Sequence, residues 1–405
     1  MNSKQPLRVL QVVESALTGV GRHLFDLTEG LVEMGHSVHL IYSPDRMDRA
    51  FERRLEALTR RSNSFAAHPL SMRRGPSARD PLIAATVARY VRNHGPFQLV
   101  HGHSSKGGAI ARLAGQLCRL PSVYTPHAIR TMNPFISPLE RRILTTAERT
   151  LARMSGAVIA VSYEEGEHLV ETLRFPAHRV RVVVNGIERF AHPDRDDARR
   201  TLQIPRDIPV AGFVGRLSDQ KGLDVLLKAW QRVLTPLPQA RLAIVGHGEL
   251  EQTLRRLALE LGVDHAVDWL GEQVGVEVMP AFDVLAFPSR YEGLSYVLLE
   301  ALVIGLPVVA SDKSSAGTAI DDGSSGYIHR VNDDAALSEH LTRLLSDPDL
   351  CAEFGWSAQN KVESFGVSQM IEQTLDVYYE ITGHDASHVS GGARTQPRSR
   401  PKYVS

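Results

Sequence analysis

The sequence predicts an α/β protein of two domains, each built on a parallel sheet with helices on both faces. The chain has 405 residues, which is too long for one ordinary hydrophobic core. Short, continuous apolar runs alternate with stretches of helical apolar spacing, and continuous apolar strands are typical of a parallel sheet buried on both faces. This alternation stops at a polar stretch, residues 192–200, and then begins again. Two domains that meet near residue 190 follow from this pattern.

The first half contains six predicted strands, at residues 8–13, 38–42, 99–101, 122–124, 157–161 and 180–184. Helices are predicted between them, for example at residues 20–34, where Leu24, Leu27 and Leu31 share one face, and at 81–93 and 138–153. Strands separated by helices pair in parallel. We place the first domain at residues 1–188.

The second half repeats the alternation, with predicted strands at residues 210–214, 242–245, 267–270, 284–287 and 308–310. A helix begins at Leu223, and a further helix ends before Pro307. We place the second domain at residues 189–366, followed by a last helix at about 367–382. Residues 384–405 have no periodic apolar face and are predicted to form a disordered basic tail.

The composition predicts a soluble, cytoplasmic protein. Hydrophobic residues make up 43% and charged residues 23% of the chain, which is typical of globular proteins. Cys118 and Cys351 lie far apart, so neither a disulfide framework nor a cysteine metal site is expected. The first residues lack a signal peptide. No stretch approaches the ~18 to 20 apolar residues of a membrane span.

The net charge of zero hides an asymmetry between the two halves. Residues 1–190 carry 26 Lys and Arg against 16 Asp and Glu, and the remainder carries the opposite excess. The excess is either ordinary solvated surface or a face for an anionic membrane or a lipid-linked acceptor. The Arg-rich stretches have helical apolar spacing and no series of aromatic residues for base stacking, so we expect no nucleic-acid partner.

Candidate ligand-binding residues lie at predicted strand ends, where open α/β sheets bind ligands. Gly19 and Gly21 follow the first strand and open a helix, which permits phosphate contact or serves a tight turn. A dinucleotide site is disfavoured, because Leu24 replaces the third glycine of GxGxxG and no acid ends the second strand. His127 follows the strand at 122–124 and is either a catalyst or a structural histidine.

The second domain opens with a basic loop that contains Arg216 and Lys221, between a strand and the helix at Leu223. A guanidinium fork and a nearby ammonium suit phosphate oxygens, although a solvated basic turn is the simpler alternative. No Walker A motif is present.

The strongest signal is the segment from Glu292 to Glu300, which lies between a strand end and a helix. Glu300 is surrounded by apolar helix neighbours, so its carboxylate needs partners, and two sugar hydroxyls would serve as well as an arginine. Gly293 and the amides after it offer an anion cradle at the start of the helix.

At these residues, over about 7–382, the chain resembles glycosyltransferase family 4, retaining enzymes of the GT-B fold. GRL-x-x-x-KG is followed by E-x7-E, with VNGI at 184–187 and VGHGE at 245–249. The resemblance implies two Rossmann-like domains that face each other across a cleft, with the acceptor on the side of the first domain and the nucleotide-sugar donor in the second. It also implies that the last helix, at about 367–382, packs back on the first domain. The segment 311–322 departs from the family pattern, so we expect its loop to contact ligands differently.

The resemblance also assigns roles. Arg216 and Lys221 would hold the donor diphosphate, Glu300 the ribose and Glu292 the transferred sugar. His127 would lie near the donor sugar and the leaving phosphate. The remaining donor-binding positions implied are Gly19, Gly21, Gly246, Gly248, Gly293, Leu294 and Ser295.

The resulting hypothesis is a retaining, metal-independent hexosyltransferase that acts in cell-envelope or exopolysaccharide assembly. It would use a nucleotide-sugar donor, with UDP as the base that the resemblance favours, and a glycan or lipid-linked acceptor. No cofactor is expected, because the loops lack a DxD-like carboxylate pair and the cations can replace a metal. Alternatives are an epimerase or phosphorylase of the same fold, or a non-catalytic sugar-nucleotide-binding protein. The inner face of the membrane is a possible peripheral location.

Overall fold

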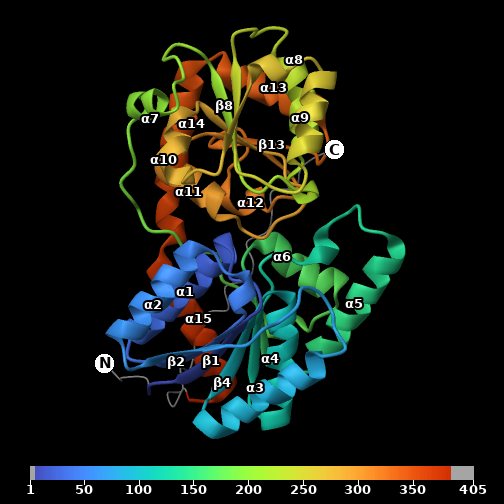
Figure 1. Ribbon diagram of the computed structural model, residues 1–405, viewed down its shortest axis with the longest axis vertical. Helices are drawn as coiled ribbons and strands as arrows, with labels where there is room; N and C mark the ends of the chain where they lie inside the picture. Colours follow the sequence, from blue (N-terminus) through green and yellow to red (C-terminus); the bar gives the residue numbers. More distant parts are fainter. Residues whose placement is uncertain (1–4, 385–405) are drawn as a thin grey trace.

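The computed structural model describes residues 5–384 of the chain. The predicted basic tail, residues 384–405, lies outside the described residues apart from its first residue. The structure has two α/β domains, with the first below the second in Figure 1.

The first domain contains a seven-stranded parallel sheet in the order β3-β2-β1-β4-β5-β6-β7. Its strands are β1 (Arg8–Val13), β2 (Ser37–Tyr42), β3 (Phe65–Pro69), β4 (Leu99–His103), β5 (Ser122–Thr125), β6 (Ala157–Ala160) and β7 (Val180–Val182). Its helices are α1 (Thr18–Glu33), α2 (Arg49–Arg61), α3 (Asp80–His94), α4 (Ser104–Cys118), α5 (Pro138–Ala152) and α6 (Tyr163–Glu167).

The second domain contains a six-stranded parallel sheet in the order β10-β9-β8-β11-β12-β13. Its strands are β8 (Val210–Val214), β9 (Arg241–Val245), β10 (Val267–Gly271), β11 (Val284–Phe287), β12 (Val308–Ser311) and β13 (Gly326–His329). The helices after β7 are α7 (Arg195–Thr201), α8 (Leu223–Val233), α9 (Glu251–Glu260), α10 (Gly275–Val278), α11 (Tyr296–Ile304), α12 (Ala316–Ala319), α13 (Asp334–Leu345), α14 (Pro348–Lys361) and α15 (Val367–Thr382).

Both sheets reverse their strand order beside their first strand, between β1 and β4 and between β8 and β11. The chain builds the sheet outward on one side of that strand and then returns to build the other side. Loops diverge at such a point and leave a crevice outside the carboxyl ends of the strands. The fold therefore places the loops after β1, β4, β8 and β11 where a ligand can bind. The predicted fold class is confirmed.

Two helices show how the sequence sets the elements near the site. The helix α11 is apolar almost all round, as a fully buried helix must be. It ends at Gly305, whose φ of +78° is left-handed, and Pro307 follows the helix end. The last helix, α15, packs on the core of the first domain through Met370, Ile371 and Tyr378 (Figure 1).

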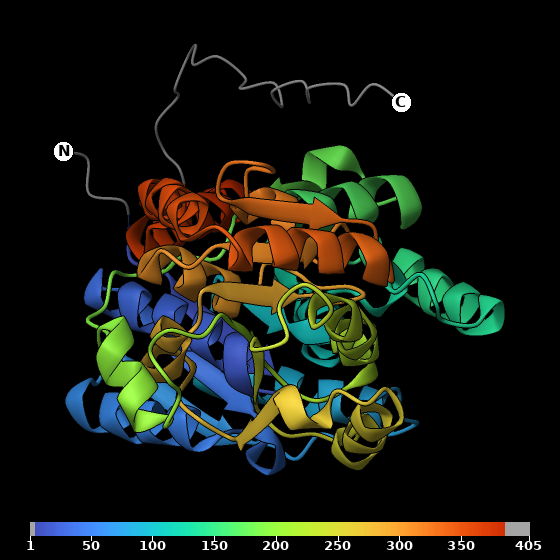
Figure 2. The same cartoon turned by 90° about the horizontal axis from the view of Figure 1, so that it is seen from above.

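The helix α5 differs from the others because it stands at the periphery. Both views show it projecting from the side of the first domain (Figures 1 and 2). It begins at a Ser137 cap, whose side chain accepts a hydrogen bond from Glu140 N, and Pro138 occupies its first turn. Its inner face is held by Glu148 and Ala152, and much of its length is exposed.

Candidate active site between the domains

The second-domain side of the site is centred on an ion pair between Lys221 and Glu292. Lys221 comes from the loop after β8, and Glu292 from the loop after β11. The Lys221 Nζ atom lies 2.6 Å from Glu292 Oε1, and the side chains are only 14% and 11% exposed. The same Nζ lies 5.1 Å from the centre of the Phe287 ring. The fold thus brings Lys221 and Glu292, which the sequence analysis predicted independently, together at the crevice of the second sheet.

Arg216 shares the loop of Lys221 but occupies a different environment. Its side chain is 57% exposed, and its Nε donates to Glu249 Oε2 at 3.0 Å. A hydrogen bond from its own backbone N–H lowers the pKa of Glu249, and the charges of Arg216 and Arg74 lower it further. An exposed pair of this kind contributes little and exchanges partners readily. Arg216 can therefore turn toward an anion without breaking a buried contact.

Glu300 has an arginine as its partner in this structure. The carboxylate Oε1 accepts a hydrogen bond from Arg22 Nη1 of the first domain at 2.6 Å. Burial in α11 raises the pKa of Glu300, and the Arg22 charge opposes this effect. Arg22 also lies over the ring of Tyr296, 4.6 Å from its centre. Of the two partners expected for Glu300, the structure therefore contains the arginine.

The first-domain side of the site carries a cluster of histidines. His103 ends β4, His127 follows β5, and His23 lies in α1. His103 Nδ1 is 3.1 Å from His127 Nε2, and the rings of His23 and His127 are 4.6 Å apart. Burial lowers the pKa of His23 to about 4 and those of His103 and His127 well below their usual value. The three imidazoles are therefore neutral at pH 7.

These imidazoles also have the geometry of a possible metal site. One ring nitrogen from each of His23, His103 and His127 lies within 4.8 Å of the other two. Neutral imidazole is a common metal ligand. No carboxylate joins this group in the part of the chain that the structure describes. The cluster can thus either hold an ion or supply uncharged hydrogen-bonding groups.

A buried carboxylate fixes the backbone at His127. Both His127 and Ala128 have left-handed backbones, with φ of +56° and +86°, which cost energy for residues other than glycine. Glu165 Oε1 accepts a hydrogen bond from Ala128 N at 2.8 Å, and its Oε2 accepts one from Val161 N at 2.9 Å. Burial raises the pKa of Glu165 to about 7. This carboxylate holds the strained turn that presents His127.

The predicted glycines lie where backbones approach closely. Gly246 has a φ of +123°, and a Cβ there would be 2.0 Å from Gly215 O. A Cβ on Gly248 would be 2.4 Å from Leu217 O, so the turn after β9 packs on the loop of Arg216.

In α1, Gly19 faces Tyr296 of the second domain, where a Cβ would lie 3.3 Å from the ring. A Cβ on Gly21 would lie 2.5 Å from Ala16 O, so Gly21 has a packing role inside the first domain.

The loop before α11 touches both domains. A Cβ on Gly293 would lie 2.9 Å from Val161 Cγ2 and 3.1 Å from Ala128 N. Leu294 O accepts a hydrogen bond from Asn185 Nδ2 at 2.6 Å, and Ser295 is the residue before α11. Asn185 Oδ1 also lies 3.0 Å from His23 Nδ1. One side chain from the VNGI segment thus links the histidine cluster to the donor-side loop.

The segment 311–322, which departs from the family pattern, makes a further contact between the domains. Ser162 Oγ donates to Ser315 Oγ at 3.1 Å, and Ser315 Oγ donates to Glu292 O at 2.7 Å. Thr318 Oγ1 donates to Glu164 Oε2 at 2.7 Å. Glu292 is therefore held by Lys221 at its carboxylate, and by Ser315 and the carbonyl of Lys313 at its backbone.

Sequence reasoning did not single out His103, Asn185, His23, Arg22 or Glu165. A signal existed for two of them, because His103 ends a strand and Asn185 lies in the quoted VNGI segment. His23, Arg22 and Glu165 lie on helices with no local sign of a role. The partners of two of them are far away in sequence, since 162 residues separate His23 from Asn185 and 278 separate Arg22 from Glu300.

Comparisons with known proteins identify the family. The model of glycosyltransferase family 4 matches residues 17–189, and that of glycosyl transferases group 1 matches residues 194–361. The D-inositol 3-phosphate glycosyltransferase of Corynebacterium jeikeium is 30% identical over 337 residues, which cover 76% of this chain and 79% of that protein. The chain belongs to glycosyltransferase family 4.

Two further proteins are similar to the chain in sequence or in structure. The α-maltose-1-phosphate synthase of Mycolicibacterium smegmatis is 29% identical over 349 residues, or 80% of this chain and 89% of that protein. Among solved structures, Anabaena Alr3699/HepE in complex with UDP and glucose superposes with a TM-score of 0.77 at 20% identity, covering 92% of this chain and 100% of that one. This similarity supports the GT-B fold. Membership of the family shows that the protein is a glycosyltransferase.

Proposed function

We propose that this glycosyltransferase moves a hexosyl group from UDP-hexose to an acceptor hydroxyl with retention of anomeric configuration. The observation that carries the proposal is the buried ion pair of Lys221 and Glu292 at the crevice of the second sheet, whose loop continues at Gly293 against the backbone of His127. UDP and glucose occupy the similarly folded HepE, which supports uridine and a hexose here.

Each predicted site residue has a physical reason for its role. Lys221 and Arg216 are the cations of the loop after β8, and both can turn their donors to a diphosphate. Glu300 would exchange Arg22 for ribose hydroxyls, and Glu292 would accept hydrogen bonds from the sugar. His127, held neutral, would donate or accept one hydrogen bond at the reacting centre.

The reaction needs no protein nucleophile in this proposal. The acceptor oxygen bonds to the anomeric carbon on the face that the diphosphate leaves. The bond from that carbon to the phosphate oxygen breaks, and its electron pair departs with the diphosphate. The hydroxyl proton passes to the departing diphosphate. Lys221 and Arg216 stabilise the growing negative charge, and fixed charges of this kind usually lower the barrier more than any other group in the site.

Ligand binding and turnover test this proposal in order. The melting temperature should rise with UDP more than with GDP or ADP, because a ligand of the folded state stabilises it. Transfer from UDP-hexose should then persist in excess chelator, and NMR of the product should show the donor's anomeric configuration. Transfer that stops in chelator and returns with magnesium or manganese would contradict the metal-independent mechanism. Inverted product would contradict retention, and interconversion of donor sugars without transfer would favour an epimerase.

We also propose that α5 places the enzyme at the cytoplasmic membrane face for envelope or exopolysaccharide assembly. Phe135, Leu139 and Ile143 are 53%, 69% and 59% exposed, and Arg142 is exposed beside them. An apolar stripe flanked by arginines suits anionic lipid. Among residues 5–384, no helix has the length and hydrophobicity to cross a bilayer.

Vesicle sedimentation tests the membrane role. The protein should sediment with anionic vesicles at low salt and be released as salt rises, since charges are screened within ~8 Å at physiological salt. Leu139→Ser with Ile143→Ser should abolish binding. The matched control, Leu82→Ser with Leu259→Ser, removes two similarly exposed leucines elsewhere and should leave binding intact. Equal loss in both double variants would contradict a role for α5.

A further inference from the structure

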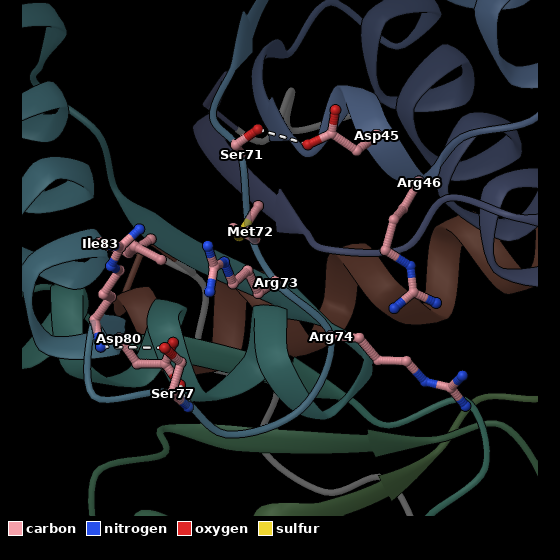
Figure 3. Close-up of a pocket in the computed structure, with 10 residues that line it drawn as sticks. Asp45, Arg46, Ser71, Met72, Arg73, Arg74, Ser77, Asp80 and Ile83 are labelled. Atoms are coloured by element: carbon pink, nitrogen blue, oxygen red, sulfur yellow. Dashed lines mark hydrogen bonds between the residues drawn. The ribbon is translucent and has the colours of Figure 1, made fainter.

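A basic pocket opens in the first domain, outside the residues assigned to the donor. Its volume is about 470 Å³, and it is lined by the segments that follow β2 and β3 and by the start of α3. Figure 3 shows Arg73 in the middle of the pocket, with Arg46 and Arg74 toward one side. These segments lie at the carboxyl edge of the first sheet, which is the ligand-binding edge of such a sheet.

The acidic groups of the pocket are already engaged. Asp80 Oδ1 lies 2.5 Å from Lys106 Nζ, and Asp45 accepts a hydrogen bond from Ser71 at 2.6 Å. Figure 3 shows Asp45 turned to Ser71, and Asp80 lies beside Ser77.

Unlike the aspartates of the pocket, most of its arginines have no ion-pair partner. Arg46 pairs with Glu14 at 2.7 Å. Arg73, Arg74 and Arg79 have no carboxylate at ion-pair distance within residues 5–384, the part of the chain that the structure describes. Three guanidinium groups without an ion-pair partner around one cavity favour an anionic ligand.

The pocket is connected to the donor side of the cleft. Arg46 bonds to Glu14 and Ser15, which follow β1 and lead into the loop of Gly19. Arg74 is close enough to Glu249, the partner of Arg216, to lower the pKa of that carboxyl. Between the pocket and His127 lie only the ends of β1 and β4 in the sheet order. A molecule in the pocket can thus reach toward both the diphosphate loop and the histidine cluster.

We propose that this pocket is the acceptor subsite and that the acceptor carries a phosphoryl group bound by Arg73 and Arg74. The inference rests on the proposed function and specifies its substrate class. The phosphoryl group is a handle only: no bond to it forms or breaks, and a separate hydroxyl of the same molecule takes the sugar. A planar guanidinium gives two parallel hydrogen bonds to phosphate oxygens, which a lysine cannot match.

The test measures binding to the full chain saturated with UDP, so that the donor diphosphate site is already occupied. Calorimetric titration with glucose 1-phosphate, glucose 6-phosphate and free glucose compares anionic and neutral probes. At least one phosphate ester should bind, and glucose should bind at least tenfold more weakly. Arg73→Ala with Arg74→Ala should weaken the phosphate ester by roughly 10- to 100-fold, since each lost charged hydrogen bond is substantial. Both arginines lie in an exposed loop, so this variant should fold.

A matched control variant tests whether the loss of binding depends on the position of the arginines or only on the loss of charge. Arg89→Ala with Arg92→Ala removes the same charge from exposed positions on α3 and should leave probe binding within twofold. UDP affinity and slow hydrolysis of the donor without acceptor should be unchanged in Arg89→Ala with Arg92→Ala. Absence of binding by both phosphate esters, or equal loss in the two double variants, would overturn the acceptor assignment. If the unaltered protein neither binds nor hydrolyses the donor, the result would instead contradict the proposed function.

A second arm identifies the source of the phosphoryl group. Transfer of labelled hexose is measured to the soluble sugar phosphates and to a polyisoprenyl diphosphate sugar in neutral vesicles. Preference for either acceptor, lost in Arg73→Ala with Arg74→Ala, supports the proposal and names the source. Equal use of phosphorylated and unphosphorylated sugars would overturn it.

Discussion

The two faces of the cleft differ in the charge of their side chains. The second-domain face carries cations with carboxylate partners, in the pairs of Lys221 with Glu292 and Arg216 with Glu249. The first-domain face carries neutral imidazoles whose pKa values are depressed by burial. Charge that develops on a leaving diphosphate needs fixed cations, whereas a hydroxyl that attacks needs uncharged groups that orient it. The difference therefore divides the proposed reaction between the domains.

The two ion pairs of the second-domain face differ in how deeply they are buried. Lys221 and Glu292 are mostly buried, so removal of one leaves the other charge poorly solvated. Arg216 and Glu249 are more than half exposed, and a surface pair contributes about 0–1 kcal/mol. The buried cation is thus prepositioned, and the exposed cation moves to its ligand.

The largest expected effect comes from removing the buried cation. Lys221→Ala should lower kcat by roughly a thousandfold, since each tenfold corresponds to about 1.4 kcal/mol of lost transition-state stabilisation. The Kd for UDP should rise far less. Lys228→Ala, at an exposed position of α8, is the control and should leave kcat unchanged.

The unpaired Glu292 could obscure this result, so Lys221→Ala is combined with Glu292→Gln. The double variant should keep the melting temperature near that of the unaltered protein and still lack turnover. Normal kcat in the folded double variant would contradict the charged-face assignment.

A smaller loss is expected at the exposed cation. Arg216→Ala should lower kcat by roughly a hundredfold, with little change in melting temperature. Arg216→Lys should recover only part of this activity, because an ammonium lacks the bidentate fork. Steady-state kinetics on the three proteins measure the difference. Full recovery in Arg216→Lys would show that charge alone matters at this position.

A tenfold effect is expected at Glu300, where the structure shows an arginine partner. If the carboxylate exchanges Arg22 for ribose, Glu300→Gln should weaken UDP by about tenfold, the scale of one or two hydrogen bonds. The unaltered protein should prefer UDP to 2′-deoxy-UDP, and Glu300→Gln should not. Arg22→Ala removes the pair but should spare UDP affinity. Unchanged UDP affinity with a lowered melting temperature in Glu300→Gln would sink the ribose role.

The subtlest prediction concerns the pH dependence of stability on the neutral face. His23 has a depressed pKa, so its contribution rises as pH rises from about 4 to 6.5. Glu165 has a pKa raised by burial from 4.5 to about 7, so its contribution falls as pH rises through that window. The two slopes oppose each other. Glu165→Gln removes the falling slope, so the melting temperature should climb more steeply between pH 4.5 and 7 than in the unaltered protein.

The same variant tests the positioning role of Glu165. If this carboxylate holds the turn at His127, Glu165→Gln should lower kcat while leaving the KM for the donor within about twofold, as expected when only transition-state contacts are lost. Unchanged kcat together with an altered pH slope would mean that Glu165 is merely structural.

The sequence could predict most of the secondary structure, because continuous apolar runs and helical spacing report directly which faces are buried. The strands β1, β8 and β11 match the predicted ranges, and the fold class follows from their alternation. Two strands escaped prediction, β3 (Phe65–Pro69) and β13 (Gly326–His329). Neither strand contains a continuous apolar run, since β3 reads FAAHP and β13 reads GYIH, so neither gives the sequence signal of a buried strand.

The candidate site divides in the same way. Lys221, Glu292, Glu300 and His127 were found from the sequence alone, because strand ends and polar groups in apolar segments are local features. Only the tertiary structure decided that Lys221 meets Glu292, that Arg22 meets Glu300, and that Glu165 holds the His127 turn. The periodicity of buried residues can be recognised from neighbouring positions in the sequence. The pairing of Arg22 with Glu300 depends on how two separately built sheets face each other, and the other two contacts depend on how segments that follow different strands of one sheet come together. No local pattern records either arrangement.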